Sequence, residues 1–545
     1  MNPLLILLFG MAVVIGGILV LRLHAFLALI IAALLVAGLT SREQIYQNEL
    51  RIAGVQVIEV DEIGAVLKPN RKQRVHDGAV AVYRPDETTG DLKWIGDAQL
   101  KIQSNLPMRV AIVGLDVNPK DRIVHDVQDQ QATAQSKKNI GERVATGFGN
   151  TCLGIGILIA MAAIVGKCLM ASGAAERIVL SLTNQLGEKH APLAFVGSGF
   201  TLGIPVFFDT VFYLLIPLGK ALRVKTGKNY LLYVLAIVCG GSMAHSLVPP
   251  TPGPLFVAEE LGVAIGLMMI GGLVVGFFTS GTGYFFARWA NRRWDIPLRE
   301  SAELSHADLA AIANRDEKEL PGLFISLLPI LLPVVLMGTA TVVNMLESWP
   351  GWIEKLKPTL LLLGNKNIAL TLAAGCSLLL VAKKLTRVQI AASVQSALAS
   401  GGVIILITAA GGAFGYTLGQ TGIATTIQQM VPGSATSLIP LGFFLCMIIR
   451  TAQGSATVAM ITTVGMMAPI ASATALSYHP LYLALAIGCG SKPISWMNDS
   501  GFWVISKMSG LTEAEMLKTN TVMGLVMAAV GLTVCMLGAA ILPLT

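Results

Sequence analysis

Two short stretches place ionisable residues and prolines inside strongly apolar sequence, and they constrain the fold more than any other feature. Residues 203–222 read GIPVFFDTVFYLLIPLGKAL, with Asp209 behind two phenylalanines; residues 240–254 read GGSMAHSLVPPTPGP, with four prolines after His245. An ionisable residue at membrane depth is costly and marks a functional site. A broken backbone at that depth is tolerated only within protein or against a water-filled cavity. A similar combination recurs in residues 450–503. We therefore predict a polytopic membrane protein whose functional site lies where broken segments meet.

Composition supports a membrane location. The mean hydropathy is +0.68; 54% of residues are hydrophobic and 13% are charged, against roughly a quarter charged in soluble domains. Residues 1–21 have no basic residue before the apolar run and no small-residue cleavage site, which predicts a retained helix rather than a signal peptide. The net charge of +7 is explained by basic cytoplasmic loops, without nucleic-acid binding. All seven cysteines lie in apolar segments without a CxxC pair, which argues against disulfides and zinc.

The first half divides into membrane segments and one polar insert. Residues 1–40 predict two transmembrane helices. Residues 41–145 hold 15 basic and 15 acidic residues, and their short apolar runs between turns predict a β-rich soluble insert that ends in a polar linker near 126–142. Residues 146–287 predict the remainder of a first repeat, including a re-entrant hairpin at 192–219 with basic residues on both flanks and a broken helix at 229–258. Residues 288–320 are predicted to be a cytoplasmic linker.

The second half, residues 321–545, repeats this plan. A hairpin at 436–470 has uncharged flanks, a broken helix follows at 481–506, and Lys383, Lys384 and Arg387 mark a cytoplasmic side. Each half then has five spans plus a hairpin, so the halves must have opposite orientation, as in secondary transporters. The predicted fold class is an all-α polytopic membrane protein with two inverted repeats, each of five transmembrane helices and a re-entrant hairpin, and a small extracytoplasmic β-rich insert.

The hairpin tips and helix breaks supply the candidate functional residues. Half-helices expose free N–H groups and a positive dipole end, which suit a carboxylate, and small hydroxyl and amide side chains suit polyol hydroxyls. A desolvated aspartate can take up and release a proton. The proton-coupling candidates are Asp209 and His245, and the substrate-binding candidates are Thr251, Gln453, Ser455, Thr457, Ser495, Asn498 and Asp499.

Each candidate has a structural alternative. Asp209 could pair with Lys167 or cap a helix, and His245 could bond carbonyls freed by the break. Ser455 and Thr457 could be small packing residues, and Asn498 and Asp499 could be helix caps. For Arg450, snorkelling or ion pairing is favoured over substrate binding. Lys492 could either neutralise Asp499 or bind an anion.

Motifs of soluble enzymes are missing from the sequence. GTGYFFA at 281–287 lacks the GxxxxGK[ST] pattern, and neither HExxH, GxSxG nor a paired Cys/His metal pattern occurs. A membrane-embedded hydrolase is conceivable because Asp, His and Ser all lie at depth, but the pairing of broken helices across the halves argues against it. We therefore predict a protein that is not an enzyme and that uses no metal or cofactor.

An ordered set of strings resembles the gluconate permease family, within the wider ion-transporter superfamily. These strings are GNT at 149–151, GKCLMASGAAERI at 166–178, GIPVFFDTVFYLLIPL at 203–218, HSLVPPTPGP at 245–254, GSATVA at 454–459 and NDSGFW at 498–503. The resemblance covers about 1–40 and 140–545. The insert at 41–145 departs from the family pattern, and Lys492 within the second break could alter substrate choice.

The resemblance implies proton-coupled symport of gluconate or a related sugar acid, with some members carrying D-serine instead. It also implies a moving transport domain with an elevator-type cycle, a homodimer, and the bacterial inner membrane. By motif, it assigns binding roles to Asp209, His245, Thr251, Ser455, Thr457, Asn498 and Asp499. The alternatives are a sodium-coupled carboxylate carrier, a D-serine carrier, and a membrane sensor whose insert binds ligand without transport.

Overall fold

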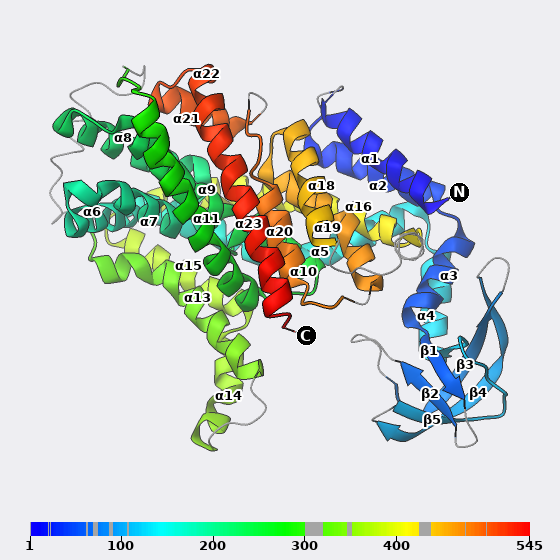
Figure 1. The fold of residues 1–545 in the computed structure, drawn as a ribbon. Coiled ribbons are helices and arrows are strands. Elements are labelled where there is room, and N and C mark those ends of the chain that lie inside the picture. The colour runs from blue at the N-terminus through cyan, green and yellow to red at the C-terminus, as the bar shows by residue number, and fades with distance from the viewer. Residues whose placement is uncertain are drawn as a thin grey trace.

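The computed structural model describes residues 2–19, 21, 23–60, 64–68, 75–86, 91–105, 108–299, 320–345, 351–423, 438–474, 476–496 and 499–544. Most of these residues form a body of packed helices, and one small sheet domain lies at its end (Figure 1). The helices of the first half are α1 (Pro3–Leu19), α2 (Ala25–Leu39), α3 (Arg42–Ala53), α4 (Asp126–Lys137), α5 (Ile140–Ala171), α6 (Ala174–Leu186), α7 (Ala191–Gly203), α8 (Phe208–Thr226), α9 (Tyr230–Leu247), α10 (Pro252–Glu260) and α11 (Ile265–Arg293).

The second half continues the helical body. Its helices are α13 (Leu323–Met345), α14 (Gly351–Leu363), α15 (Lys366–Ala382), α16 (Arg387–Gly419), α18 (Leu438–Gln453), α19 (Ala456–Ala473), α20 (Leu481–Gly490), α21 (Ser500–Ser509), α22 (Glu513–Met516) and α23 (Val522–Ile541). Residues Leu517–Thr521 form a π-helical segment between α22 and α23. In the described residues, six helices are long and apolar enough to cross a membrane, or up to eight if each bent pair is one span.

Residues 55–125 fold separately from the membrane helices, as a closed barrel of antiparallel strands in the order β1-β2-β5-β4-β3-β6. The strands are β1 (Val55–Val60), β2 (Ala65–Lys68), β3 (Gly78–Pro85), β4 (Leu92–Asn105), β5 (Met108–Val113) and β6 (Arg122–His125). Alternate apolar side chains fill the interior, among them Val57, Val80, Val82 and Val110, all fully buried. Because the barrel is closed, the described strands leave no open sheet edge.

Helices α3 and α4 pair as a stalk between the barrel and the helical body (Figure 1). The Tyr46 hydroxyl donates to Asp129 Oδ1 at 3.0 Å, and Tyr83 of the barrel donates to the same oxygen at 2.7 Å. Burial and these contacts raise the pKa of Tyr83. Asn48 Nδ2 donates to the carbonyl of Gly419 at 3.1 Å, which ties the stalk to α16. The predicted polar linker at 126–142 is therefore largely helical, because α4 gains a packing partner in α3.

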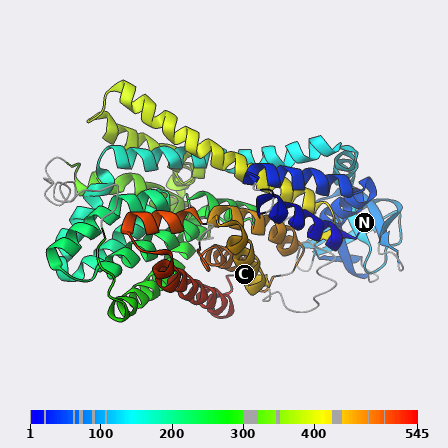
Figure 2. The same cartoon turned by 90° about the horizontal axis from the view of Figure 1, so that it is seen from above.

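Long helices α5 and α16 pack together, and α2 lies against α16 (Figure 2). Gly147 permits the close approach: a Cβ at this position would lie 2.7 Å from Tyr416 Cβ and 2.9 Å from Ala413 Cα. Small residues at such contacts let helix backbones approach within a membrane.

Candidate functional site

Two helix pairs and two broken helices meet around one cavity of about 250 Å³. The cavity lies between the starts of α8, α19 and α21, the end of α9, and the π-helical segment before α23. Its polar and charged lining residues are Asp209, Ser242, His245, Arg450, Ser455, Thr457, Lys492, Ser495, Asp499 and Asn520.

The first half supplies an acid and an imidazole. Helix α7 ends at Gly203 and α8 begins at Phe208, which places Asp209 in the first turn of α8, where the helix dipole favours a carboxylate. Helix α9 ends at Leu247, and α10 resumes at Pro252. The prolines between them lack an N–H group and cannot continue the α9 ladder. His245 therefore lies in the last turn of α9.

The second half supplies two helix caps. Gly454, with φ of 85°, separates α18 from α19 in a conformation that favours glycine. Ser455 caps α19 by accepting from Val458 N at 3.4 Å. Asp499 caps α21 by accepting from Gly501 N at 2.9 Å. Helices α8, α19 and α21 thus begin at the cavity, and their free N–H groups and positive dipole ends favour an anion there.

The two cations of the cavity differ in their partners. The Arg450 guanidinium forms a salt bridge with Asp499 and donates to the carbonyls of Ser491, at 3.0 Å, and Gly454. Ser495 also donates to Asp499, at 2.5 Å. Among the described residues, by contrast, no carboxylate lies within 4.0 Å of Lys492. Arg450 therefore braces the second hairpin tip against the second break, whereas Lys492 faces the cavity without a carboxylate partner.

Asp209 and Asp499 flank the same glycine. A Cβ at Gly501 would lie 3.4 Å from Asp499 Oδ1 and 3.7 Å from Asp209 Oδ1. His245 packs its ring edge on Phe207, with ring centroids 5.9 Å apart, and its buried Nδ1 has no hydrogen-bond partner among the described residues. Asp209 forms no ion pair with Lys167. The cavity thus combines the Asp499 carboxylate, which is paired with Arg450, the Asp209 carboxylate, which forms no ion pair among the described residues, and the imidazole of His245.

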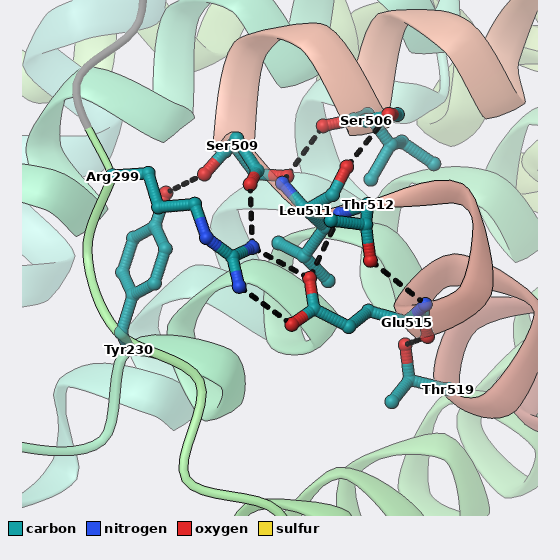
Figure 3. Close-up of polar contacts among 10 residues, drawn as sticks. Tyr230, Arg299, Ser506, Ser509, Leu511, Thr512, Glu515 and Thr519 are labelled. Carbon is teal, nitrogen blue, oxygen red and sulfur yellow. Dashed lines mark hydrogen bonds and ion pairs between the residues drawn. The ribbon is translucent and has the colours of Figure 1, made fainter.

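The far end of α21 is fixed by a second polar cluster (Figure 3). Arg299 makes a bidentate pair with Glu515, with distances of 2.6 and 2.8 Å, and donates to the carbonyl of Gly510 at 2.9 Å. Tyr230, at the start of α9, donates to the carbonyl of Ser509 at 2.6 Å. The second broken helix is therefore anchored to the first one outside the cavity.

The structure brings together six of the nine predicted residues: Asp209, His245, Ser455, Thr457, Ser495 and Asp499. Thr251 does not line the cavity; its hydroxyl donates to Val248 O at 2.7 Å, within the first break. Asn498 lies outside the described residues, and only the backbone of Gln453 is described. Their roles stay predictions.

Sequence reasoning missed Asn520, which is 5% exposed and lies on the π-helical segment. Short π segments are frequent at functional sites. The available signal was the polar run KTNT at 518–521 in an otherwise apolar helix. No group of three or more metal-ligating side chains occurs in the described part of the chain.

This architecture, with paired and broken helices around a polar cavity in an apolar helical body, defines a membrane transporter. Residues 131–541 match the model of the GntP family permeases. The chain belongs to this family, as the sequence motifs predicted, and is a permease rather than an enzyme.

Relatives match over most of their length. An uncharacterized permease of Haemophilus influenzae is 34% identical over 378 residues, covering 68% of this chain and 77% of that protein. The gluconate permease of Bacillus subtilis is 29% identical over 396 residues, covering 71% and 87%. Among solved structures, Neisseria gonorrhoeae MtrF, described as illuminating a class of antimetabolite efflux pumps, matches with a TM-score of 0.55 and 18% identity. The match covers 77% of this chain and 88% of the MtrF chain, which shows a shared fold.

Proposed function

We propose that this permease carries gluconate or a related sugar acid by proton-coupled symport across the bacterial inner membrane. The named substrate of the Bacillus subtilis relative supports the substrate class. The cavity supports it independently, because helix N-termini suit a carboxylate, and the hydroxyls of Ser455, Thr457 and Ser495 suit a polyol. Its volume of about 250 Å³ lies just below the roughly 300–1,000 Å³ of drug-sized pockets, which favours a small ligand.

The observation that carries the proposal is the unpaired state of Lys492. A cation at membrane depth is costly unless it is paired, and no carboxylate of the described residues pairs with this one. Asp209 and Asp499 interact with Lys492 only from beyond 4.0 Å, so a substrate carboxylate would supply the direct ion pair. Because three helices begin around the same cavity, their dipoles add to the attraction.

Asp209 and His245 are proposed to couple proton and substrate occupancy. Asp209 lies beside Phe207 and Phe208 and has no ion pair among the described residues. A change of its charge in this setting costs much free energy, so protonation and substrate binding can be linked. His245, with its unpartnered Nδ1, is the second candidate for the proton.

Inverted repeats and an elevator-type cycle are part of the proposal. Three pairs of contacts support it, because each of these contacts has a counterpart in which the corresponding helices of the two halves are exchanged. Helix α2 packs on α16 as α15 packs on α5; α1 packs on α2 as α13 packs on α15; and α10 packs on α19 as α21 packs on α8. The hairpins and broken helices would then move as one unit against α2, α5, α15 and α16. Assembly as a homodimer is proposed from the family resemblance alone.

Uptake into proteoliposomes tests this proposal. Purified protein is reconstituted with an imposed pH gradient, a sodium gradient or neither, and labelled gluconate is supplied, with D-serine as a competitor. We expect concentrative gluconate uptake that depends on the pH gradient. Accumulation with sodium alone would contradict proton coupling. No accumulation of any sugar acid or D-serine would contradict transport and favour a sensor.

A further inference from the structure

A second cavity lies where the chain leaves the membrane helices for the barrel. Its volume is about 580 Å³, and it shares no residue with the first cavity. It lies between the junction of α2 with α3 and the junction of α4 with α5. Its lining residues are Ala37, Gly38, Thr40, Ser41, Arg42, Ile45, Lys138, Asn139, Ile140, Gly141 and Arg143.

The charged side chains that line this cavity are basic. Arg42, Lys138 and Arg143 line it, and no acidic residue of the described chain does. The acidic Glu49, which does not line the cavity, interacts electrostatically with Lys138. The neighbouring Glu142 carboxylate accepts from Asn139 N at 2.9 Å in a capping box, so it is engaged with the backbone. Three cations converging on one cavity attract an anion.

Two helices begin at the same cavity. Ser41 caps α3 by accepting from Gln44 N at 3.2 Å, and Asn139 caps α5 by accepting from Glu142 N at 2.9 Å. These caps satisfy the third amide of each helix, so the first two amides of each helix have no intrahelical partner. Both helix N-termini carry the positive end of the helix dipole.

Arg143 is the independent observation that points to a ligand. Its side chain is only 2% exposed. Nη1 donates to Ala37 O and Nε donates to Gln420 Oε1, each at 2.8 Å. Nη2 is buried and has no hydrogen-bond partner among the described residues, where no carboxylate lies within 4.0 Å either. A buried guanidinium without a counter-charge is strongly destabilising, so a bound anion would resolve the imbalance.

We propose that this cavity binds a phosphate group, supplied by the headgroup of an anionic phospholipid. Arginine guanidinium groups and helix N-termini both favour phosphate oxygens. The position favours a lipid over a free ion, because α2 leads to the cavity with Ile31 and Leu34 exposed, and Ile140 at its rim is also exposed. Acyl chains can lie on these apolar residues while the headgroup enters the basic pocket. The lipid would then join the stalk of the barrel to the helical body.

Lipid titration of the full-length protein in detergent tests this. Dissociation constants are measured by native mass spectrometry for phosphatidylglycerol and phosphatidylcholine, with inorganic phosphate as a competitor. Arg42→Gln/Lys138→Gln removes two of the cations, and both residues are at least partly exposed, which favours folding of the variant. Lys137→Gln is the matched control, because this exposed residue does not line the cavity.

We expect the wild type to prefer phosphatidylglycerol, and the double variant to bind it about thirtyfold more weakly, at roughly fivefold per cation. Lys137→Gln should bind like the wild type. Competition by millimolar inorganic phosphate would overturn the lipid assignment in favour of a free anion. Both lipids carry a phosphate group, so equal binding of the two would overturn the preference for an anionic headgroup. An unchanged constant in the double variant would overturn the phosphate site itself.

Discussion

At the scale of single residues, the two cations of the first cavity differ in role: Arg450 holds neighbouring segments together, whereas Lys492 is proposed to bind the substrate. Arg450 is 5% exposed, and its guanidinium pairs with Asp499 and donates to two backbone carbonyls. Lys492 has no such set of partners. Removing one partner of a buried pair costs about 3–5 kcal/mol, since it leaves the other charge unpaired. Substitutions of the two cations should therefore have different consequences.

Lys492→Gln is predicted to weaken substrate binding while the protein stays folded. Hydrogen bonds to charged groups contribute about 1.5–3 kcal/mol, so KM for gluconate should rise about tenfold to a hundredfold. Initial uptake rates in proteoliposomes give KM, and Lys492→Arg should recover part of the affinity. Arg450→Gln is the contrast: it should lower the unfolding temperature instead. An unchanged KM in Lys492→Gln would remove this residue from the substrate site.

Asp209→Asn is predicted to abolish proton-driven accumulation while exchange of labelled for unlabelled substrate survives. An amide mimics the protonated carboxyl, and no ion pair among the described residues is lost. Accumulation and exchange are measured in the same vesicles. Asp499→Asn serves as the comparison and should impair both, because it breaks the pair with Arg450. If Asp209→Asn accumulates substrate with the wild-type pH dependence, coupling belongs to His245 or Asp499.

Of the six cavity residues that the sequence predicted, Asp209, His245 and Asp499 were conspicuous because an ionisable residue is costly in apolar sequence. Ser455, Thr457 and Ser495 were predicted from their positions at a hairpin tip or a helix break. Asp209 and His245 stand beside aromatic residues or prolines, and Asp499 follows a Gly- and Pro-marked break. The pairing of Arg450 with Asp499 joins residues 49 positions apart, which no local pattern encodes. Thr251 was placed at the site by its position in the break, but its hydroxyl satisfies a carbonyl of that break instead.

At the scale of elements, Arg299, in the segment after α11, pairs with Glu515 of α22 and donates to the carbonyl of Gly510 at the end of α21 (Figure 3). The bidentate geometry orients both side chains, and their side chains are 36% and 24% exposed. Glu515 also belongs to the capping box of α22, accepting from Thr512 N at 2.8 Å. Through its bond to Gly510, Arg299 also contacts one end of α21, whose other end begins at the cavity.

A double-mutant cycle with Arg299→Ala and Glu515→Ala is predicted to give a coupling energy of about 1 kcal/mol, the upper end for partly exposed pairs. Thermal unfolding of the four proteins provides the values. Glu513→Ala is the control, because it is exposed on the same turn and forms no ion pair among the described residues. A coupling energy near zero would show that backbone contacts alone hold α21.

Element positions were predictable where Pro and Gly interrupt apolar sequence. The broken helix expected at 229–258 corresponds to α9 and α10 at 230–260, and the one expected at 481–506 to α20 and α21 at 481–509. Helix α14, at 351–363, was not predicted, since its charged residues and Pro358 disrupt the apolar pattern. Helix α4 was missed because its polar sequence has no apolar stripe, and packing on α3 stabilises it.

At the scale of the whole molecule, the contacts at the two ends of α5 show which other helix ends lie beside each of them. Arg143 at the start of α5 bonds to Ala37 at the end of α2 and to Gln420 after α16. At the other end of α5, a Cβ on Gly173 would lie 2.9 Å from Leu320 Cδ2 and 3.7 Å from Lys384 Nζ. Helix α5 has 32 residues, which at 1.5 Å each make about 48 Å, enough to cross a bilayer core of about 30 Å. We therefore expect the barrel and Lys383 to lie on opposite sides of the membrane.

Cysteine labelling is predicted to place the barrel outside the cell. The insert is balanced in charge, whereas Lys383, Lys384 and Arg387 cluster at the opposite end, and basic residues mark the cytoplasmic side. In a variant without the seven native cysteines, Asp91→Cys should react with an impermeant maleimide in intact cells. Lys383→Cys, exposed after α15, should react only after permeabilisation. Labelling of both in detergent controls for folding and access. The reversed pattern would place the barrel in the cytoplasm and invert both halves. Labelling of both residues in intact cells would contradict the expectation that they lie on opposite sides of the membrane.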